Sequence, residues 1–239
     1  AQCPDGFQLT ASRLANEISH ISVCVCTYRR PQLLKRLLNE LSRQETGGQF
    51  TYSIVIADND GEESARAIVS EFAQASGVPV HYCVETRRNI ALARNKVVEN
   101  ARGEFVALID DDEFPVKNWL LTLFKTCKEY GVDGVLGPVK RHFDEQPPAW
   151  IVKSKFYERR VNPTGTIVHW HEARTGNVLV KREVLVDGET PFRPEFRAGE
   201  DQDFFRRKIE KGHKFIWSAD AVAYEVVPPA RWKRSYMLR

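Results

Sequence analysis

Residues 103–113 read Gly-Glu-Phe-Val-Ala-Leu-Ile-Asp-Asp-Asp-Glu, an apolar run that a glycine opens and four consecutive acids close. A short apolar run of this kind is typical of a buried strand in a mostly parallel sheet, and the acids place its carboxyl end in solvent. Four neighbouring carboxylates repel one another, and a hard divalent cation would relieve that repulsion through oxygen ligands. The acid run at 110–113 therefore indicates either a metal site or a solvated acidic turn.

The composition is that of an ordinary globular chain. Of its 239 residues, 42% are hydrophobic and 28% charged, which is enough to bury a large core. The net charge of +3 is too small to indicate a nucleic-acid partner. No apolar run approaches the roughly 18 residues of a membrane span, and the N-terminus shows no secretory-signal pattern. Five cysteines, an odd number scattered through apolar segments, favour reduced thiols in the cytoplasm.

The first 140 residues alternate apolar strands with amphipathic helices. Strands are expected at residues 21–26, 53–57, 80–84, 105–109 and 132–139. Helices are expected from Pro31 onward and over residues 62–76, 89–101 and 119–130. Repeated β-α units of this length predict an α/β fold with a mostly parallel, Rossmann-like central sheet and helices on both faces.

The chain beyond residue 140 is less regular, and a smaller mixed region is expected there. Short strands are predicted at residues 166–171, 177–180, 214–217 and 221–226, with a helix over 201–211. No flexible polar linker separates the two parts, so residues 1–239 are expected to form a single domain.

Polar residues follow the expected strands at the point where each strand ends. The first strand leads into Thr27 and Tyr28, the second into Asp58, and the fourth into the acid run. Carboxyl ends of parallel strands meet at one edge of a sheet, where α/β proteins bind ligands. Tyr28 can stack on a base, Asp58 can accept hydrogen bonds from a base or ribose, and a cation on Asp112 can bridge a diphosphate. The pattern indicates a nucleotide-diphosphate pocket, with turns and caps as the alternative for single residues.

Basic side chains and a second acidic group complete the set of candidate residues. No GxGxxG or GxxxxGK[ST] motif occurs, so metal and arginine would have to meet the phosphate charge. Arg94 lies near the start of an expected helix, close to the proposed pocket. Asp201, just before the helix in the second half, has two interpretations. It is either the N-cap of that helix or a general base that takes a proton from an attacking hydroxyl.

Taken together, these segments resemble family 2 glycosyltransferases, which have the GT-A fold. The resemblance covers nearly the whole chain, in the family's order and spacing. It is carried by residues 22–31 (Ser-Val-Cys-Val-Cys-Thr-Tyr-Arg-Arg-Pro), 57–60 (Ala-Asp-Asn-Asp), 89–95 (Asn-Ile-Ala-Leu-Ala-Arg-Asn), 109–113, 175–177 (Thr-Gly-Asn) and 199–201 (Gly-Glu-Asp). Within the family, the chain is most similar to bacterial exopolysaccharide glucosyltransferases of the succinoglycan type, also through Val-Leu-Gly-Pro-Val at 135–139.

The resemblance implies a role for each matching residue. The uridine of a UDP-sugar donor would be held by Thr27, Tyr28 and Asp58. The remainder of the nucleotide sugar would lie against Arg94, Asp110 and Asp111. The metal ligand of the family's DxD motif would be Asp112, with Mn2+ or Mg2+ as the ion. The general base would be Asp201, and the acceptor or sugar pocket would include Asn177 and Glu200. Which of the three aspartates bind the metal stays open at this point.

The resemblance further implies an inverting, metal-dependent transfer of a hexose, glucose in the exopolysaccharide enzymes, to a saccharide hydroxyl. Residues from about 20 to 140 would bind the nucleotide sugar, and residues from about 141 to 227 would hold the acceptor and the base. The basic tail at 228–239 suits contact with the inner face of the cell membrane and a lipid-linked acceptor. Two alternatives are a catalytically inactive sugar-nucleotide or glycan-binding domain of the same fold and, with less support, a nucleotidyltransferase.

Two remaining motifs have structural interpretations. His169 and His171 are expected on one face of a strand, without a third metal ligand. Trp150, Trp170 and Trp217 can stack on sugar rings, but buried tryptophans are more often part of the core.

Overall fold

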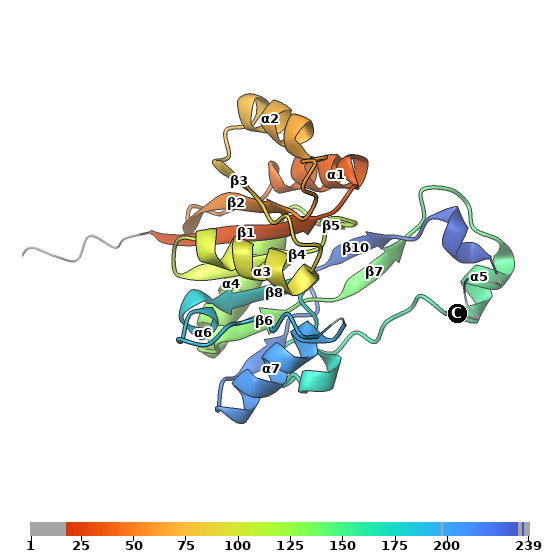
Figure 1. Cartoon of the computed structure of the whole chain (residues 1–239). Coiled ribbons are helices and arrows are strands. Elements are labelled where there is room, and N and C mark those ends of the chain that lie inside the picture. Colours follow the sequence, from red (N-terminus) through yellow and green to blue (C-terminus); the bar gives the residue numbers. More distant parts are fainter. Residues whose placement is uncertain (1–17, 197, 234–235, 237–239) are drawn as a thin grey trace, which may run out of the picture.

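The central sheet has seven strands in the order β3-β2-β1-β4-β8-β6-β9 (Figure 1). In this computed structural model, residues 18–196, 198–233 and 236 are described. The strands are β1 (Ser19–Thr27), β2 (Phe50–Asp58), β3 (Val80–Val84), β4 (Phe105–Ile109), β6 (Gly134–Leu136), β8 (Asn177–Lys181) and β9 (Phe215–Trp217). β8 is antiparallel to both of its neighbours, and the other six strands run in one direction. The predicted mostly parallel sheet is confirmed.

Helices cover both faces of this sheet because successive strand residues point to opposite sides. One core packs β1 and β4 against α1 (Pro31–Leu41), α2 (Arg66–Ala75) and α4 (Trp119–Tyr130). The other core packs them against α3 (Ile90–Asn100), α6 (Arg182–Leu185) and α7 (Glu200–Glu210). Val23 belongs to the first core and its neighbour Cys24 to the second, as the alternation requires.

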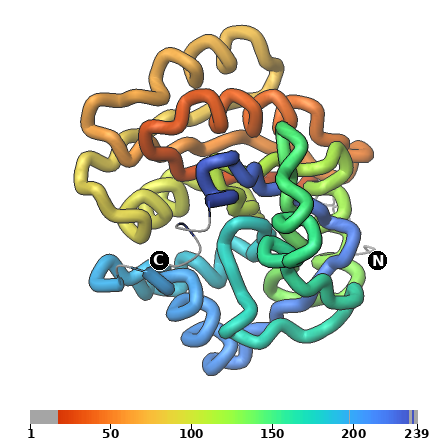
Figure 2. The backbone as a smooth tube through the Cα atoms, turned by 90° about the vertical axis from the view of Figure 1, so that its right-hand side faces the viewer, coloured from red at the N-terminus to blue at the C-terminus, as the bar shows by residue number. Residues whose placement is uncertain are grey.

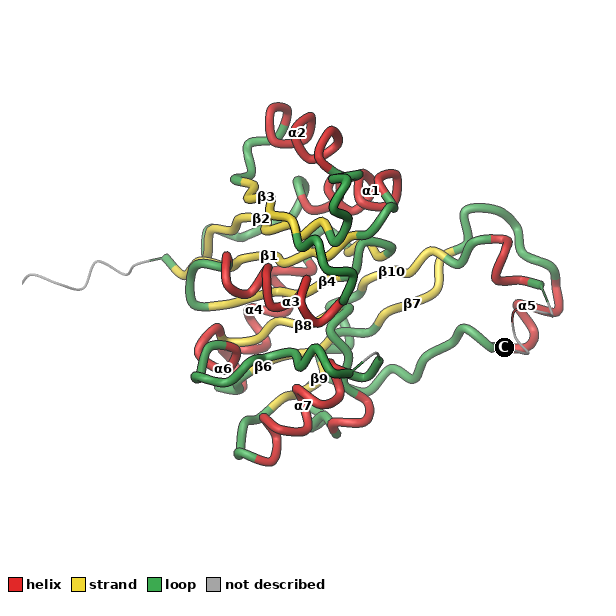
Figure 3. Tube along the Cα trace, in the orientation of Figure 1, coloured by secondary structure: helices red, strands yellow, loops and turns green. Residues whose placement is uncertain are grey.

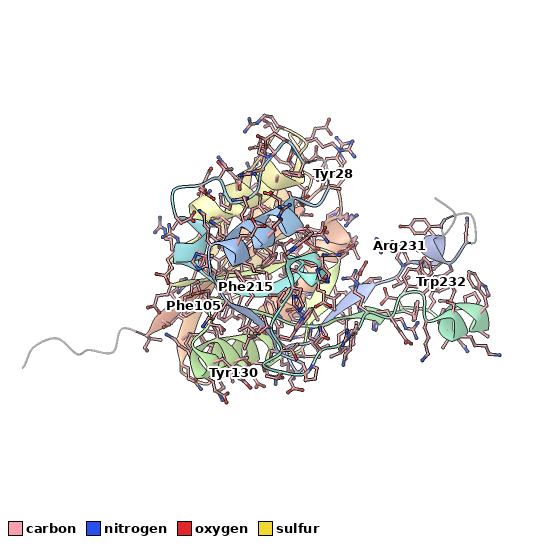
Figure 4. All side chains as sticks on the ribbon, turned by 90° about the horizontal axis from the view of Figure 1, so that it is seen from below. Tyr28, Phe105, Tyr130, Phe215, Arg231 and Trp232 are labelled. Carbon is pink, nitrogen blue, oxygen red and sulfur yellow. The ribbon has the colours of Figure 1, made fainter. Side chains whose placement is uncertain are left out.

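A second, three-stranded sheet in the order β5-β10-β7 extends from the edge of the molecule (Figure 3). It consists of β5 (Glu113–Pro115), β10 (Ala223–Val226) and β7 (Val139–His142). α5 (Ala149–Ser154) and the 3-10 helix η2 (Pro229–Trp232) lie at the far end of this extension. The segment that follows α5 is joined to η2 by a hydrogen bond from the Tyr157 hydroxyl to the Arg231 carbonyl (2.6 Å). Figure 2 views the molecule from this end, and Figure 4 places Arg231 and Trp232 on the extension.

The prediction of one strand over residues 132–139 is wrong, because the chain changes sheets in the middle of that stretch. β6 ends at Leu136 and β7 begins at Val139. Pro138 has no N–H to donate to a continuous ladder. At Gly137 a Cβ atom would lie 2.0 Å from the Ala221 carbonyl oxygen, so only glycine fits where the chain crosses.

The prediction of a strand over residues 166–171 is also wrong. Only an isolated bridge joins Ile167 to Ile216, and η1, a 3-10 turn, follows over Trp170–Glu172. The rings of His169 and His171 stack with centroids 5.7 Å apart, so the two side chains lie together on a turn rather than on a strand face.

Candidate active site

The carboxyl ends of β1 and β4 open into a cleft of about 840 Å³. β1 and β4 are neighbours in the sheet, with Cys24 paired to Leu108, so the polar residues that follow each strand come together. Seven of the candidate residues line the cleft: Thr27, Tyr28, Arg94, Asp110, Asp111, Asp112 and Asp201. The predicted convergence of strand ends is therefore present, with the helix residue Asp201 on another wall of the same space.

The buried carboxylate of Asp111 holds the ends of β1 and β4 together. Its Oδ2 accepts a hydrogen bond from the Thr27 hydroxyl (2.7 Å), and its Oδ1 accepts one from Arg30 Nη1 (3.1 Å). The same Arg30 nitrogen lies 3.2 Å from Asp112 Oδ2. Burial raises the pKa of Asp111, while the Thr27 and Arg30 contacts oppose that rise. The Arg30 guanidinium thus binds two neighbouring carboxylates of the acid run.

The acid run carries more negative charge than its surroundings balance. Burial, and then the carboxylates of Asp110 and Asp111, raise the pKa of Asp112 to about 6. Arg231 approaches Asp112 only to 3.8 Å, from the described part of the tail. Burial, and then Asp110 and Asp112, hold the pKa of Glu113 well above its usual range. Added positive charge would stabilise the ionised form of these groups.

The donor set at this place fits a hard cation. Among residues 18–196, 198–233 and 236, no three or more His, Cys, Asp or Glu side chains are grouped so that they could hold a metal. Mg2+ needs no such cage, because it is usually bound by one or two carboxylates, several waters and substrate phosphates. Asp112 as the protein ligand, with the excess negative charge around it, meets that requirement.

Arg94 connects the acid run to the helix that carries Asp201. Asn89 caps α3 by accepting hydrogen bonds from the Ala91 and Leu92 amides, which fixes the start of the helix. From α3, Arg94 Nη1 contacts the Glu200 carboxylate, and Nη2 lies 3.6 Å from Asp110 Oδ1. The guanidinium is buried, whereas the Asp110 side chain is 45% exposed to the cleft. A single arginine thus ties β4 to the first residue of α7.

Asp201 is not the N-cap of its helix. α7 begins at Glu200, and its N-cap is Gly199, whose φ of 84° lies in the left-handed region that favours glycine. The Asp201 Oδ1 atom accepts a hydrogen bond from the Gln202 amide (2.8 Å), and the side chain lines the cleft. The capping interpretation is therefore wrong, and the carboxylate lies on the wall of the cleft.

Tyr28 lies at the rim of the cleft in a cationic setting. The guanidinium of Arg88 lies 4.6 Å from the ring centroid, and that of Arg29 lies 5.4 Å from it. Arg29 has a positive φ of 53°, which turns the chain sharply from β1 into α1. The tyrosine ring is thus placed at the strand end that the sequence predicted for base stacking.

Residues 22–187 match the family model described as "Glycosyl transferase family 2". The chain belongs to this family. The "Succinoglycan biosynthesis protein ExoM" of Rhizobium meliloti (strain 1021) is 32% identical to the chain over 233 residues, which are 95% of this chain and 73% of that protein. The poly(ribitol-phosphate) beta-glucosyltransferase of Bacillus spizizenii is 26% identical over 210 residues, which are 87% of this chain and 32% of that protein.

Solved structures show that this family 2 glycosyltransferase has the GT-A fold. S. aureus TarS 1-349 in complex with UDP has a TM-score of 0.68 at 20% identity, covering 88% of this chain and 61% of that chain. The mannosyltransferase PcManGT from Pyrobaculum calidifontis, in complex with GDP-Man and Mn2+, has a TM-score of 0.67 at 21% identity. The match covers 93% of this chain and 60% of that chain. The family 2 chain spans less than two thirds of either solved chain.

Three candidate residues of the family 2 chain do not line the cleft. Asp58 is fully buried and accepts hydrogen bonds from the Asp60 and Ala65 amides and the Tyr82 hydroxyl. Glu200 is buried against Arg94. The carboxylates of Asp58 and Glu200 thus hold neighbouring backbone or side chains in place.

Asn177, the third of these residues, has a side-chain amide that is fully engaged by the protein. It accepts a hydrogen bond from Trp119 Nε1 (2.7 Å) and donates to the carbonyls of Pro138 (3.1 Å) and Ala221 (2.8 Å). The amide therefore holds the segment after β6 beside the segment before β10.

Several residues that line the cleft were not among the sequence candidates. They are Arg30, Asn59, Arg88, Arg159, Arg174, Thr175 and Glu225. Arg30 could have been predicted from the sequence, because it belongs to the same strand-end motif as Tyr28. Arg159 and Glu225 come from the irregular second half and form an ion pair of 2.8 Å. No local sequence pattern predicts this pair.

Proposed function

We propose that this chain is an inverting glycosyltransferase that moves a hexose, with glucose as the proposed sugar, from a UDP-sugar to a saccharide hydroxyl. The acceptor is proposed to be a growing, lipid-linked exopolysaccharide. The observation that carries the proposal is the single cleft into which Tyr28, the acid run and Asp201 all project. The names of two similar proteins, one a succinoglycan biosynthesis protein and one a beta-glucosyltransferase, support the substrate class.

Donor binding is assigned to the strand ends. Tyr28 would stack on the uracil, and Thr27, Arg94, Asp110 and Asp111 would surround the ribose and diphosphate. Asp58 would act on the nucleotide through the loop that its carboxylate holds, because the next residue, Asn59, lines the cleft. TarS, a structure of the same fold, binds UDP and UDP-GlcNAc.

Asp112 would hold Mn2+ or Mg2+ together with the diphosphate, and the Mn2+ complex of PcManGT supports that choice of ion. When bound, the cation would neutralise part of the negative charge on the departing diphosphate. Arg30 already pairs with Asp111 and Asp112, and would keep the two carboxylates in place as the donor enters.

Asp201 would take the proton of the acceptor hydroxyl. The hydroxyl oxygen would form a bond to the anomeric carbon as the bond from that carbon to the diphosphate oxygen breaks, so UDP departs and the configuration inverts. Glu200 and Arg94 would keep Asp201 in position, since their ion pair anchors the first turn of α7. These two residues act by positioning rather than in the chemistry itself.

A donor screen tests the proposed function. UDP- and GDP-sugars are added to the chain with Mn2+ or with EDTA, and thermal stabilisation and sugar release are measured. We expect Mn2+-dependent stabilisation by UDP-hexoses, because a ligand that binds only the folded state raises its stability. Stabilisation without any transfer or hydrolysis would instead support the inactive binding domain. If no nucleotide sugar stabilises the chain, the proposal fails.

We propose that the enzyme works in the cytoplasm and contacts the inner face of the cell membrane through the tail at 228–239. No helix in the described part of the chain has the length and apolar character to cross a bilayer. In the described tail, Trp232 packs against Phe143, which follows β7, with ring centroids 6.0 Å apart. Exposed Phe156 lines a cavity together with Arg231 of the tail, and the exposed Lys153 and Lys155 precede it in the chain.

A shortened chain tests the membrane contact. Each basic residue near an anionic surface contributes about 1 kcal/mol, and the tail contains four lysines and arginines. We therefore expect a chain that ends before Pro228 to bind phosphatidylglycerol vesicles at least tenfold more weakly than the full chain in a sedimentation assay. Phosphatidylcholine vesicles are the control surface. Equal binding by the two chains would exclude the tail as the contact.

A further inference from the structure

A second cavity, of about 390 Å³, lies beside the donor cleft. Its floor is formed where β6 and β9 end, at Gly137 and Trp217, and where β8 begins, at Asn177. β6 and β9 run in the same direction as β4, so the cavity opens on the edge of the sheet that also carries the acid run. Arg159 and Arg174 line both the cavity and the cleft, which makes the two spaces neighbours with a shared arginine wall.

The wall of this cavity carries three arginines, Arg159, Arg160 and Arg174, and one acid, Glu172, which forms no ion pair with any of them. Arg159 is paired with Glu225. Arg160 makes no hydrogen bond or ion pair with any described residue. Arg174 donates from Nη1 to the carbonyls of His171 (3.2 Å) and Ala173 (2.6 Å), and no carboxylate within the described ranges pairs with it. The backbone contacts hold the Arg174 guanidinium in place while its other N–H groups stay free for a ligand.

Trp217 adds a second, independent feature. The side chain is only 9% exposed, and its indole N–H has no hydrogen-bond partner among residues 18–196, 198–233 and 236. A buried indole N–H normally has an acceptor, so its absence here marks a place that is completed by something else. Trp217 lines the cavity, and a pyranose ring offers an apolar face that can pack against an indole.

We propose that this second cavity binds the acceptor saccharide through an anionic group, a carboxylate or a phosphate, carried on a sugar near the one that reacts. Arg160 and Arg174 bind the anion, and Trp217 packs against the sugar ring. From the cavity the acceptor chain passes the shared wall of Arg159 and Arg174 into the cleft that holds Asp201. The inference rests on the proposed glycosyl transfer and adds to it the charge of the acceptor.

Binding of three disaccharides tests the inference. Cellobiose is neutral, cellobiouronic acid carries a carboxylate, and cellobiose 1-phosphate carries a phosphate. Dissociation constants are measured by ligand-observed NMR on the full chain with UDP and the diamagnetic ion Mg2+ present, so that the donor cleft is filled. At 50 mM salt we expect at least one of the two anionic sugars to bind about tenfold more tightly than cellobiose, and the difference to shrink at 500 mM salt. The tighter of the two identifies the anionic group.

Matched variants assign the preference to the cavity. Arg160→Gln should remove most of the anion preference and leave UDP affinity unchanged, because Arg160 lines the second cavity and does not line the cleft. Arg174→Gln should remove it as well. Arg43→Gln, an exposed arginine just after α1, is the control and should keep the wild-type preference. Trp217→Phe, which reduces the ring surface that packs against the sugar, should weaken the binding of all three sugars alike.

The outcomes that overturn the inference differ from those that overturn the proposed function. Equal binding of the three disaccharides, or an anion preference that survives both arginine substitutions, ends the inference while UDP binding stands. Failure of the wild-type chain to bind UDP with Mn2+ ends the proposed function itself.

Discussion

Replacing Asp201 by asparagine is expected to lower sugar transfer about 10³-fold while UDP affinity stays at its wild-type value. A positioned general base contributes roughly 10² to 10⁴ to the rate, and an amide of the same shape cannot accept the proton. The side chain lines the cleft from α7, whereas the residues assigned to the nucleotide come mainly from the strand ends. Transfer is measured with a radiolabelled donor, and UDP affinity by calorimetry.

The matched control for this variant is Asp203→Asn. Asp203 lies in the same first turn of α7, so both substitutions remove one negative charge from the amino end of the helix. Asp203 pairs with Arg207 and does not line the cleft. We expect the Asp203→Asn variant to retain most of the transfer activity. Near-normal turnover by Asp201→Asn would remove Asp201 from the role of base.

Replacing Asp112 by asparagine is expected to weaken UDP binding at least tenfold in the presence of Mn2+ and to make it insensitive to EDTA. Wild-type UDP binding should itself fall when EDTA is added. The physical reason is that Asp112 is the carboxylate proposed to carry the cation, and an amide oxygen is a much weaker ligand for it. Calorimetry with and without EDTA reads out the effect independently of turnover.

Parallel variants separate the three aspartates. Asp110→Asn and Asp111→Asn are assayed in the same way, and whichever retains EDTA sensitivity does not supply an essential metal ligand. Asp144→Asn is the control, because Asp144 is an exposed acid paired with Arg36 and lies outside the cleft. Unchanged UDP affinity in Asp112→Asn, with and without EDTA, would contradict the metal assignment.

Most of the first half of the fold could be predicted, because local sequence patterns determine its strands and helices. The strands β3 and β4 and the helix α4 have the predicted bounds. β4 is a continuous buried run and α4 has a clear helical stripe, whereas β3 is a short, mostly half-buried strand. In the second half the strands are three to five residues long, and their places depend on partners far along the chain. The reversal of β8, which pairs with β4 and β6, has no local signal.

The candidate site divides in the same way. Thr27, Tyr28 and the acid run line the cleft because parallel neighbours end at the same edge, a rule that needs only the strand order. Whether a carboxylate faces a ligand or holds the protein together depends on which donors surround it. The Asp58 carboxylate accepts hydrogen bonds from two backbone amides and a tyrosine hydroxyl, and the Glu200 carboxylate pairs with Arg94. Only the folded chain brings those donors to them.

The position of β8 has a consequence for anyone who would re-engineer this enzyme. The strand belongs to the later part of the sequence, yet it lies between β4 and β6 in the sheet. A fragment cut near residue 140 would leave β4 with an unpaired edge, and such edges recruit foreign strands. We therefore expect such a fragment to aggregate. New acceptor preferences are better sought by grafting the loops after β6 and β9, which border the second cavity and leave the sheet intact.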